Sequence, residues 1–226
     1  MKKISLIILL FFSFGSLGHA TCLKTVTTAL TDVQTCGESE TLTVKSTGSI
    51  IRSGSKAVAA NNGVGASNTT VINHGLISAT SESINMKSSG GTNKITNTGT
   101  INTAQNENAS SGIAVVVQKT DGTEIDNSGT IHGGNYAIQG LETDDIIITN
   151  SGTISANNTT GPAIYLTNGT NATITNTGTI TSLRHGIRLG KGHGSLNNAT
   201  IINSGLIAGT THNDRNSIYV SDDDNV

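Results

Sequence analysis

Aliphatic and polar residues alternate in a short unit that recurs along the chain. The unit reads aliphatic, any residue, Asn, any residue, Gly, any residue, Ile, and full copies occupy 71–77, 95–101, 125–131, 148–154, 174–180 and 201–207. A degenerate copy at 44–50 has Ser46 in the Asn place and Gly48 in the Gly place. Alternation with a period of two is typical of a strand with one buried face. Each copy therefore predicts a β-strand.

The spacing of the copies predicts how these strands are arranged. The motif glycines lie at positions 48, 75, 99, 129, 152, 178 and 205, so successive copies are 23 to 30 residues apart. A second apolar alternation follows each copy, for example at 84–86, 113–115, 164–166, 187–189 and 218–220. A period of about 26 residues, rich in β-branched side chains, fits one turn of a β-solenoid. We predict an all-β fold, a right-handed single-stranded parallel β-helix of about six to seven coils of roughly 26 residues.

Stacking of equivalent residues explains the composition of the unit. In a parallel solenoid, Ile lies on Ile and buries apolar surface at about 0.8 kcal/mol per CH₂. We expect Asn to hydrogen-bond from coil to coil and to tolerate positive φ, and Gly to supply a turn conformation that a side chain would penalise. A disordered Asn/Thr tract is the alternative, and the repetition argues against it. The predicted structural repeat residues are Asn73, Gly75, Asn97, Gly99, Asn127, Gly129, Asn150, Gly152, Asn176, Gly178, Asn203 and Gly205.

The N-terminal residues indicate export. Residues 1–20 are predicted to be a signal peptide, with a positive start, an apolar run from 4 to 14 and small residues at 18–20. Residues 21–40 are predicted to form an N-terminal cap, and 41–226 the β-helix. Export makes a disulfide between Cys22 and Cys36 plausible. A lipid on Cys22 is disfavoured by His19 and Thr21 before it, and a metal site lacks further ligands nearby.

Composition excludes several classes of protein. Charged residues make up 12% of the chain and the net charge is −2, so no positive stripe suggests nucleic-acid binding. Outside the predicted signal, no run approaches the roughly 18 apolar residues of a membrane-spanning helix. All three Phe lie within the predicted signal and there is no Trp, so three Tyr are the only aromatic residues beyond it. A thin core explains this scarcity, because a solenoid has no room for a large ring in every coil.

Catalytic and metal-binding patterns are weak. Ser195 lies near His193, but the segment fits neither a nucleophile elbow nor a phosphate-binding loop. The histidines are scattered without metal-ligand spacing, and the acidic run 222–224 suggests no more than loose Ca²⁺ binding. The sequence therefore predicts no catalytic residue, no metal site and no cofactor.

Two surface features suggest binding. The residue after the buried aliphatic of the second alternation is Asn85, Ala114, Gln139, Tyr165, Arg188 and Tyr219 in successive coils. If the coils are in register, Tyr165, Arg188 and Tyr219 form an outward column that could hold a sugar or an anionic glycan, or could simply stack for structural reasons. Rows of hydroxyls such as 96/98/100, 149/151/153 and 175/177/179 raise ice binding as another possibility, although Asn-x-Gly bends the chain within each row.

The repeated I-x-N-x-G-x-I coils, preceded by a signal and a short cap with a Cys pair, resemble the passenger region of bacterial autotransporters of type V secretion. The resemblance covers about residues 40 to 226 and implies a parallel β-helix displayed outside a Gram-negative cell. It also implies a C-terminal membrane barrel, which this sequence lacks. By the repeat rhythm the chain stops at Val226 within a coil, so we expect a truncated passenger. Localisation would be the outer membrane or cell surface if a barrel exists, and otherwise periplasmic or secreted.

The resemblance implies a non-enzymatic adhesin segment. Its partner would be a glycan or protein on a host or neighbouring cell, or a second copy of the chain, with contact to a membrane only through the missing barrel. A secreted β-helical protein that binds or degrades polysaccharide is the alternative, because such enzymes also use β-helices. An ice-binding Thr-rich solenoid is the third possibility.

Overall fold

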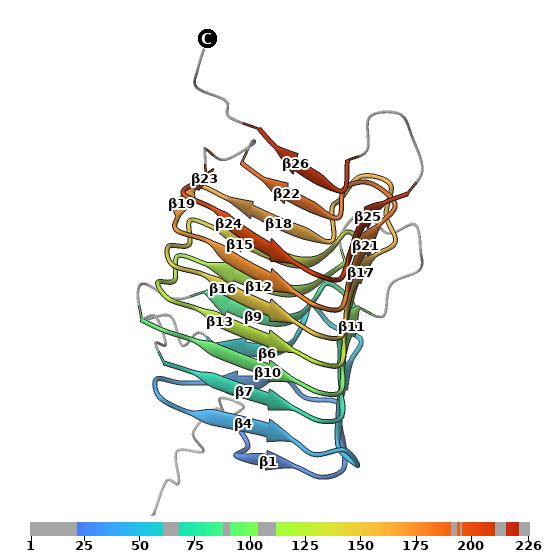
Figure 1. The fold of residues 1–226 in the computed structure, drawn as a ribbon. Helices are drawn as coiled ribbons and strands as arrows, with labels where there is room; N and C mark the ends of the chain where they lie inside the picture. The colour runs from blue at the N-terminus through green and yellow to red at the C-terminus, as the bar shows by residue number, and fades with distance from the viewer. Residues whose placement is uncertain are drawn as a thin grey trace, which may run out of the picture.

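The computed structural model describes residues 22–60, 68–87, 91–103, 112–190, 194, 196–210 and 216–221. In this part of the chain all secondary-structure elements are β-strands, and the strands wind into a solenoid (Figure 1). The predicted all-β, parallel β-helical fold is confirmed. The predicted signal peptide, His193, Ser195 and the acidic run 222–224 lie outside the described residues.

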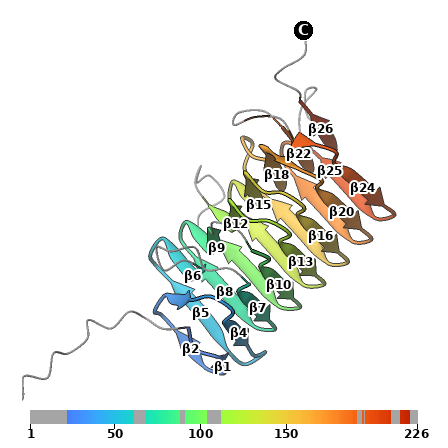
Figure 2. The same ribbon diagram turned by 90° about the vertical axis from the view of Figure 1, so that its left-hand side faces the viewer.

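Three parallel sheets of eight strands each form the walls of the solenoid (Figure 2). The first sheet holds β1 (Thr25–Val26), β4 (Thr41–Val44), β7 (Thr70–Asn73), β10 (Lys94–Asn97), β13 (Glu124–Asn127), β16 (Ile147–Asn150), β20 (Thr173–Asn176) and β24 (Thr200–Asn203). The second holds β2 (Ala29–Leu30), β5 (Ser49–Arg52), β8 (Leu76–Ala79), β11 (Thr100–Thr103), β14 (Thr130–Gly133), β17 (Thr153–Ala156), β21 (Thr179–Ser182) and β25 (Leu206–Gly209). The third holds β3 (Gln34–Cys36), β6 (Lys56–Ala60), β9 (Glu82–Lys87), β12 (Ile113–Gln118), β15 (Tyr136–Leu141), β18 (Ile164–Thr167), β22 (Ile187–Leu189) and β26 (Ile218–Val220). A short pair, β19 (Gly169–Thr170) and β23 (Leu196–Asn197), lies beside them.

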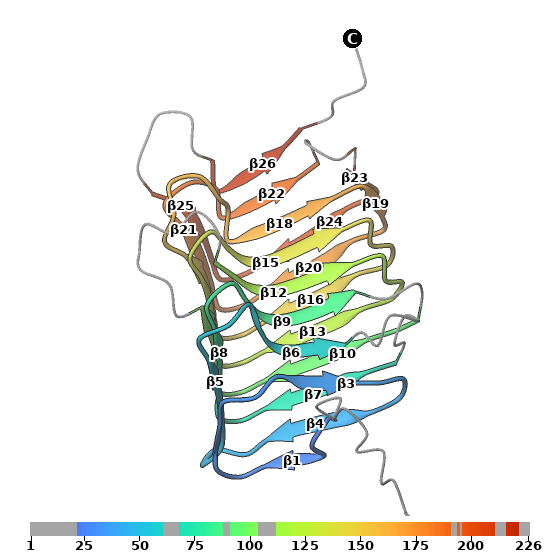
Figure 3. The same ribbon diagram turned by 180° about the vertical axis from the view of Figure 1, so that it is seen from behind.

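Each rung visits the three sheets in turn, and the winding is right-handed. In Figure 1 the first sheet faces the viewer, the second lies at the right, and the third lies behind, where Figure 3 shows it directly. A right-handed connection between parallel strands is the rule, because right-twisted strands return to their sheet most easily that way. Motif asparagines that contact one another are 24, 30, 23, 26 and 27 residues apart, in agreement with the predicted period.

In-register columns of aliphatic side chains fill the interior. On the first sheet Ile95, Ile125, Ile148 and Ile174 lie directly above one another and are buried. The corresponding buried columns run through Ile77, Ile101, Ile131, Ile154 and Ile180 on the second sheet, and through Ile84, Val115, Ile138, Ile164 and Ile187 on the third. Each such side chain contributes about 1.5–3 kcal/mol of burial. Because one rung cannot cover its own apolar side chains, the rungs are stable only as a stack.

The motif asparagines form a continuous hydrogen-bonded column, here called the Asn ladder: Asn73, Asn97, Asn127, Asn150, Asn176 and Asn203. The Nδ2 of each donates to the Oδ1 of the next at 2.7–2.8 Å. Asn97 Nδ2, for example, also contacts the carbonyls of Gly99 and Thr130, at 3.2 and 3.1 Å. The ladder thus joins adjacent rungs at a buried position where an amide side chain needs partners.

The motif glycines are needed for close stacking and not for an unusual backbone conformation. Neither they nor the ladder asparagines have positive φ, so that part of our prediction is wrong. A Cβ on Gly129 would overlap the carbonyl oxygen of Gly99 one rung below. A Cβ on Gly152 would overlap the carbonyl oxygen of Gly129 in the same way. Positive φ instead occurs at residues such as Asn68, Asn171 and Asn198, which precede strands of the first sheet.

The degenerate copy differs from its expected alignment. Gly48 does occupy the Gly place, since its carbonyl lies against Gly75. The Asn place, however, belongs to Val44, which pairs with Asn73 in the sheet, and not to Ser46. This corner therefore contains two extra residues. Because no asparagine lies below Asn73, its Oδ1 accepts a hydrogen bond from the backbone N–H of Gly75 at 3.2 Å.

Residues from the predicted cap form a first, short rung. Its strands β1, β2 and β3 pair in parallel with β4, β5 and β6. A disulfide joins Cys22 to Cys36, the last residue of β3. The backbone N–H of Leu23 donates to Gln34 Oε1 at 3.1 Å. Val26 on this rung is buried even though no rung of the described chain lies beneath it.

The Asn ladder predicts a position-dependent loss of stability. Replacing Asn127 with Leu leaves the Nδ2 of Asn97 and the Oδ1 of Asn150 without their ladder partner. We expect a loss of about 2–4 kcal/mol in the free energy of unfolding, measured with urea. The buried Oδ1 of Asn150 loses its ladder donor, Asn97 Nδ2 keeps only its longer contacts with the Gly99 and Thr130 carbonyls, and a buried unpaired group costs about 1–3 kcal/mol. Asn203→Leu at the exposed end of the ladder is the matched control and should cost less than about 1 kcal/mol. Equal losses would contradict the ladder.

Close stacking predicts a different result for two glycines. Gly129→Ala forces two rungs apart, because the new methyl meets a backbone carbonyl. We expect a loss of about 1–3 kcal/mol, as in an overpacked core. In Gly54→Ala the methyl would meet only the flexible end of the Arg52 side chain, so stability should change by less than about 0.5 kcal/mol. Thermal unfolding followed by circular dichroism compares the two, and an unaffected Gly129→Ala protein would refute the packing argument.

Candidate functional site

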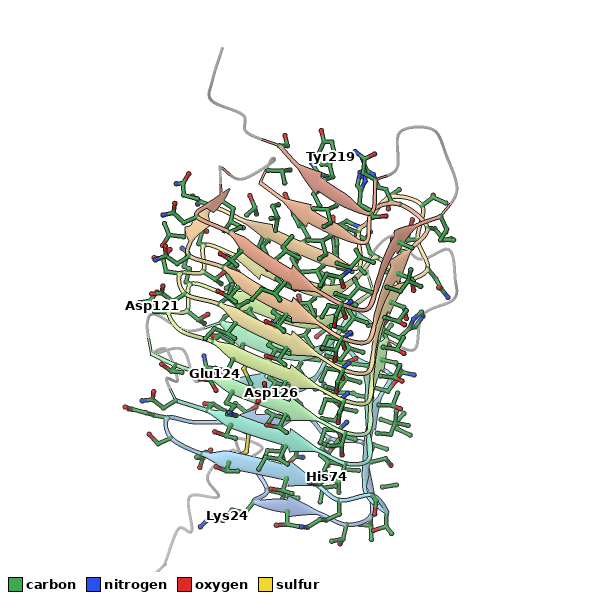
Figure 4. The ribbon with its side chains drawn as sticks, viewed as in Figure 1. Lys24, His74, Asp121, Glu124, Asp126 and Tyr219 are labelled. Carbon is green, nitrogen blue, oxygen red and sulfur yellow. A yellow bond between two sulfur atoms is a disulfide. The ribbon has the colours of Figure 1, made fainter. Side chains whose placement is uncertain are left out.

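The third sheet carries all three tyrosines of the chain. Tyr136 lies on β15, Tyr165 on β18 and Tyr219 on β26. Figure 4 labels Tyr219 at the C-terminal end of the solenoid. Aromatic rings are scarce in this protein, so their collection on one sheet near one end marks this surface as the best candidate for binding.

The sheet register places an arginine between two of these rings. Tyr165 pairs with Arg188 of β22, and Arg188 pairs with Tyr219. The guanidinium carbon of Arg188 lies 5.2 Å from the centroid of the Tyr165 ring and 5.8 Å from that of Tyr219. Both distances are within the range of a cation–π contact, which contributes about 0.5–1 kcal/mol at exposed sites and more when desolvated.

Two further rings extend this arrangement. Tyr136 stacks on Tyr165 with centroids 5.5 Å apart, and His185 stacks on Tyr219 at 4.8 Å. The His185 Nδ1 accepts a hydrogen bond from the backbone N–H of Asn216 at 3.1 Å. We call the series Tyr136, Tyr165, Arg188, Tyr219 and His185 the planar stack.

The structure modifies the predicted column in two respects. Val116 and not Ala114 lies between Asn85 and Gln139, because Val115 pairs with the buried Ile84. The prediction has Ile113 as the buried aliphatic residue of this rung, whereas Val115 occupies that position. Second, Tyr165 is only 6% exposed, so its ring does not offer the outward surface that we expected.

The accessible part of the planar stack is therefore formed by half-buried residues. Tyr136, Arg188 and Tyr219 are partly exposed, whereas His185 is buried. Sequence analysis missed Tyr136 and His185 as members. Each lies two residues before a core aliphatic, Ile138 and Ile187, and the scarcity of aromatic residues was the one signal that could have indicated Tyr136.

Three lysines elsewhere on the solenoid, Lys56, Lys94 and Lys119, have carboxylate partners. Lys94 Nζ lies 2.7 Å from Glu124 and 3.4 Å from Asp126, residues that Figure 4 labels on the first sheet. The hydrogen bond to Glu124 is the main cause that raises the pKa of Lys94, against a lowering by desolvation. The Nζ atoms of Lys56 and Lys119 lie 3.9 and 3.7 Å from the Oε2 atoms of Glu82 and Glu142.

The arginines near the planar stack lack such partners. Within the described residues, neither Arg184 nor Arg188 has a carboxylate oxygen within 4.0 Å. Arg184 donates from Nη1 to the Thr160 carbonyl. The Nε of Arg188 is buried and has no hydrogen-bond partner. The planar stack thus holds a positive charge that no carboxylate of the described chain neutralises.

Other potential sites are less promising. Cys22, Cys36 and Glu40 are the one group of three metal-ligating residue types in the described ranges, and both sulfur atoms belong to the disulfide. His74 and His132 contact the hydroxyls of Thr98 and Ser155, at 2.7 and 2.8 Å. These histidines take part in stacking between rungs.

Comparison with protein-family models, with curated proteins and with solved structures finds no match for this chain. None of the described residues belongs to a helix long and apolar enough to cross a membrane. The geometry of the planar stack indicates the chemistry that it offers. It presents ring surfaces, a fork of N–H donors and one positive charge, which together suit a sugar or an anionic group.

Burial predicts different roles for two tyrosines of the stack. Tyr165→Ala opens a space beneath Arg188 and should lower the free energy of unfolding by about 3 kcal/mol. Tyr219→Ala removes a half-buried ring on the last strand and should cost about 1 kcal/mol or less. Urea denaturation of the two variants measures both values. A larger loss for Tyr219→Ala would show that this ring, too, is mainly structural.

Proposed function

We propose that the chain is a non-enzymatic β-solenoid segment of the adhesin type, exported from a bacterium and displayed at or released from its surface. In this role it binds a glycan or protein of a host or neighbouring cell, or a second copy of itself. The observation that supports the proposal concerns the connections between strands. One corner of the solenoid has the same length in every full copy of the motif, whereas the other connections differ in length.

The constant corner is the one at the Asn ladder. In each full copy the first-sheet strand ends on the ladder asparagine, and the next strand begins after two residues. Elsewhere the connections differ: β11 ends at Thr103 and β12 begins at Ile113, whereas β14 ends at Gly133 and β15 begins at Tyr136. A frame held by one corner and carrying segments of different length is suited to display, because loop changes leave the stack intact.

The resemblance of the coils to autotransporter passengers supports the same role. The planar stack supplies a contact surface whose chemistry fits a carbohydrate. Binding through rings and an arginine requires no turnover, which agrees with the predicted absence of catalytic residues.

Adhesion can be measured directly with beads coated with the purified chain. Coated beads should be retained on epithelial cells, or on bacteria that lack the protein, several-fold better than beads coated with the heat-unfolded chain. Saturation by the soluble chain distinguishes specific binding from general stickiness. Treating the target cells with glycosidase or with protease identifies the class of receptor, and beads that adhere to one another reveal self-association.

The polysaccharide-degrading alternative predicts a different outcome. Release of reducing ends from soluble polysaccharides by the folded chain, together with no retention of coated beads, would contradict the adhesin proposal. Retention without release supports it.

Ice binding is a second candidate, favoured by one observation. Thr100, Thr130, Thr153 and Thr179 lie in one in-register column on the second sheet and are partly exposed. The corner at the Asn ladder separates these threonines from those of the first sheet. The exposed hydroxyls therefore form a column from rung to rung along the solenoid axis, and not a continuous row within one rung. Thermal hysteresis of the folded chain, lost in Thr130→Leu, would favour this function over adhesion.

A further inference from the structure

The geometry points to Arg188 and the rings around it as a binding site for a carboxylate-bearing sugar, such as a uronate unit of an acidic polysaccharide. This inference rests on the proposed role in adhesion and names the chemical group that the surface would recognise. Two observations support it. Arg188 lies between two aromatic rings, and its charge has no carboxylate partner among the described residues.

Arg188 is held between two rings by the sheet register. Tyr165 below and Tyr219 above lie 5.2 and 5.8 Å from its guanidinium carbon. With a ring on each side, the planar group is restrained in orientation, and its edges are the parts that remain for hydrogen bonds. Such a fork matches the two oxygens of a carboxylate, and restraint reduces the entropy lost when a ligand binds.

The charge of Arg188 has no carboxylate partner within the described ranges. Three lysines of the same solenoid, Lys56, Lys94 and Lys119, do lie beside a glutamate, Lys94 with its Nζ 2.7 Å from Glu124. Ring quadrupoles stabilise a cation without cancelling its formal charge. The Nε of Arg188 is buried and has no hydrogen-bond partner, so the donors that a ligand can reach are those of the Nη groups. An anionic ligand would supply the missing negative charge.

The neighbouring rings favour a sugar as the carrier of that charge. Tyr219, next to Arg188, and Tyr136, next to Tyr165, are half-buried, so each offers part of a ring to the apolar C–H face of a pyranose. Stacked rings keep these surfaces rigid, since Tyr219 lies on His185 at 4.8 Å between centroids. A free carboxylate would use the arginine alone, whereas a uronate would use the arginine and a ring together.

The test compares oligogalacturonate with its methyl ester, which has the same sugar but no charge, by isothermal titration calorimetry on the full chain. We expect the acid form to bind at least about tenfold more tightly than the ester, and to weaken as salt rises. Arg188→Gln should weaken binding of the acid form at least about tenfold, and Arg188→Lys should weaken it less, because the charge is kept but the fork is lost. Tyr219→Ala should weaken both forms, and Tyr219→Phe neither.

Arg52→Gln is the matched control, since Arg52 lies on the second sheet and donates to the Lys56 carbonyl. Far-UV circular dichroism verifies folding, and if Arg188→Gln unfolds, the Arg188→Lys protein carries the comparison. Equal affinity for acid and ester, or an affinity unchanged in both Arg188 variants, would overturn the inference. Absence of any binding would overturn it as well, while bead retention on cells would still support the proposed adhesion through another surface.

Discussion

In-register stacking of equivalent residues is the constraint on which the whole structure depends. No rung can bury its own aliphatic face, so each gains stability only from the rungs above and below. The Asn ladder is where this constraint is most specific, because an amide donates to one neighbour and accepts from the other. Gly129 and its equivalents follow from the same constraint, since adjacent backbones approach closely enough that a Cβ would meet a carbonyl oxygen.

The same register creates the candidate site. Tyr165, Arg188 and Tyr219 come from strands far apart in the sequence, yet the stacking rule places them directly above one another. No loop has to hold them in position. A binding surface built on adjacent strands of a stack is rigid to the extent that the stack is, and rigidity of this kind limits the entropy cost of binding. Adhesion and architecture therefore depend on one set of interactions.

Sequence reasoning could predict what is periodic and could not predict what interrupts the period. The recurrence of Asn and Gly was sufficient for the solenoid, its period and the contacts between asparagines. It failed at the first copy, where two extra residues move Val44 into the Asn place, because an insertion within a corner leaves no mark on the alternation itself. It placed Ala114 where Val116 lies, because β12 has several aliphatic residues in succession. The burial of Tyr165 depends on Tyr136, which arrives from the previous rung and follows no repeat.

Stacking like on like has a further consequence for charged residues, since equal charges one rung apart would repel. The first and third sheets solve this by placing opposite charges in register, with Lys94 on Glu124 and Lys56 on Glu82. Arg188 follows a different solution, in which the positions above and below are rings. The tyrosine rings place no like charge next to Arg188, and they also provide no carboxylate to neutralise it. A lysine paired with a carboxylate is already neutralised, whereas an arginine between rings keeps its charge for a molecule from outside. That difference is the physical reason to look for a ligand at Arg188 and not at the paired lysines.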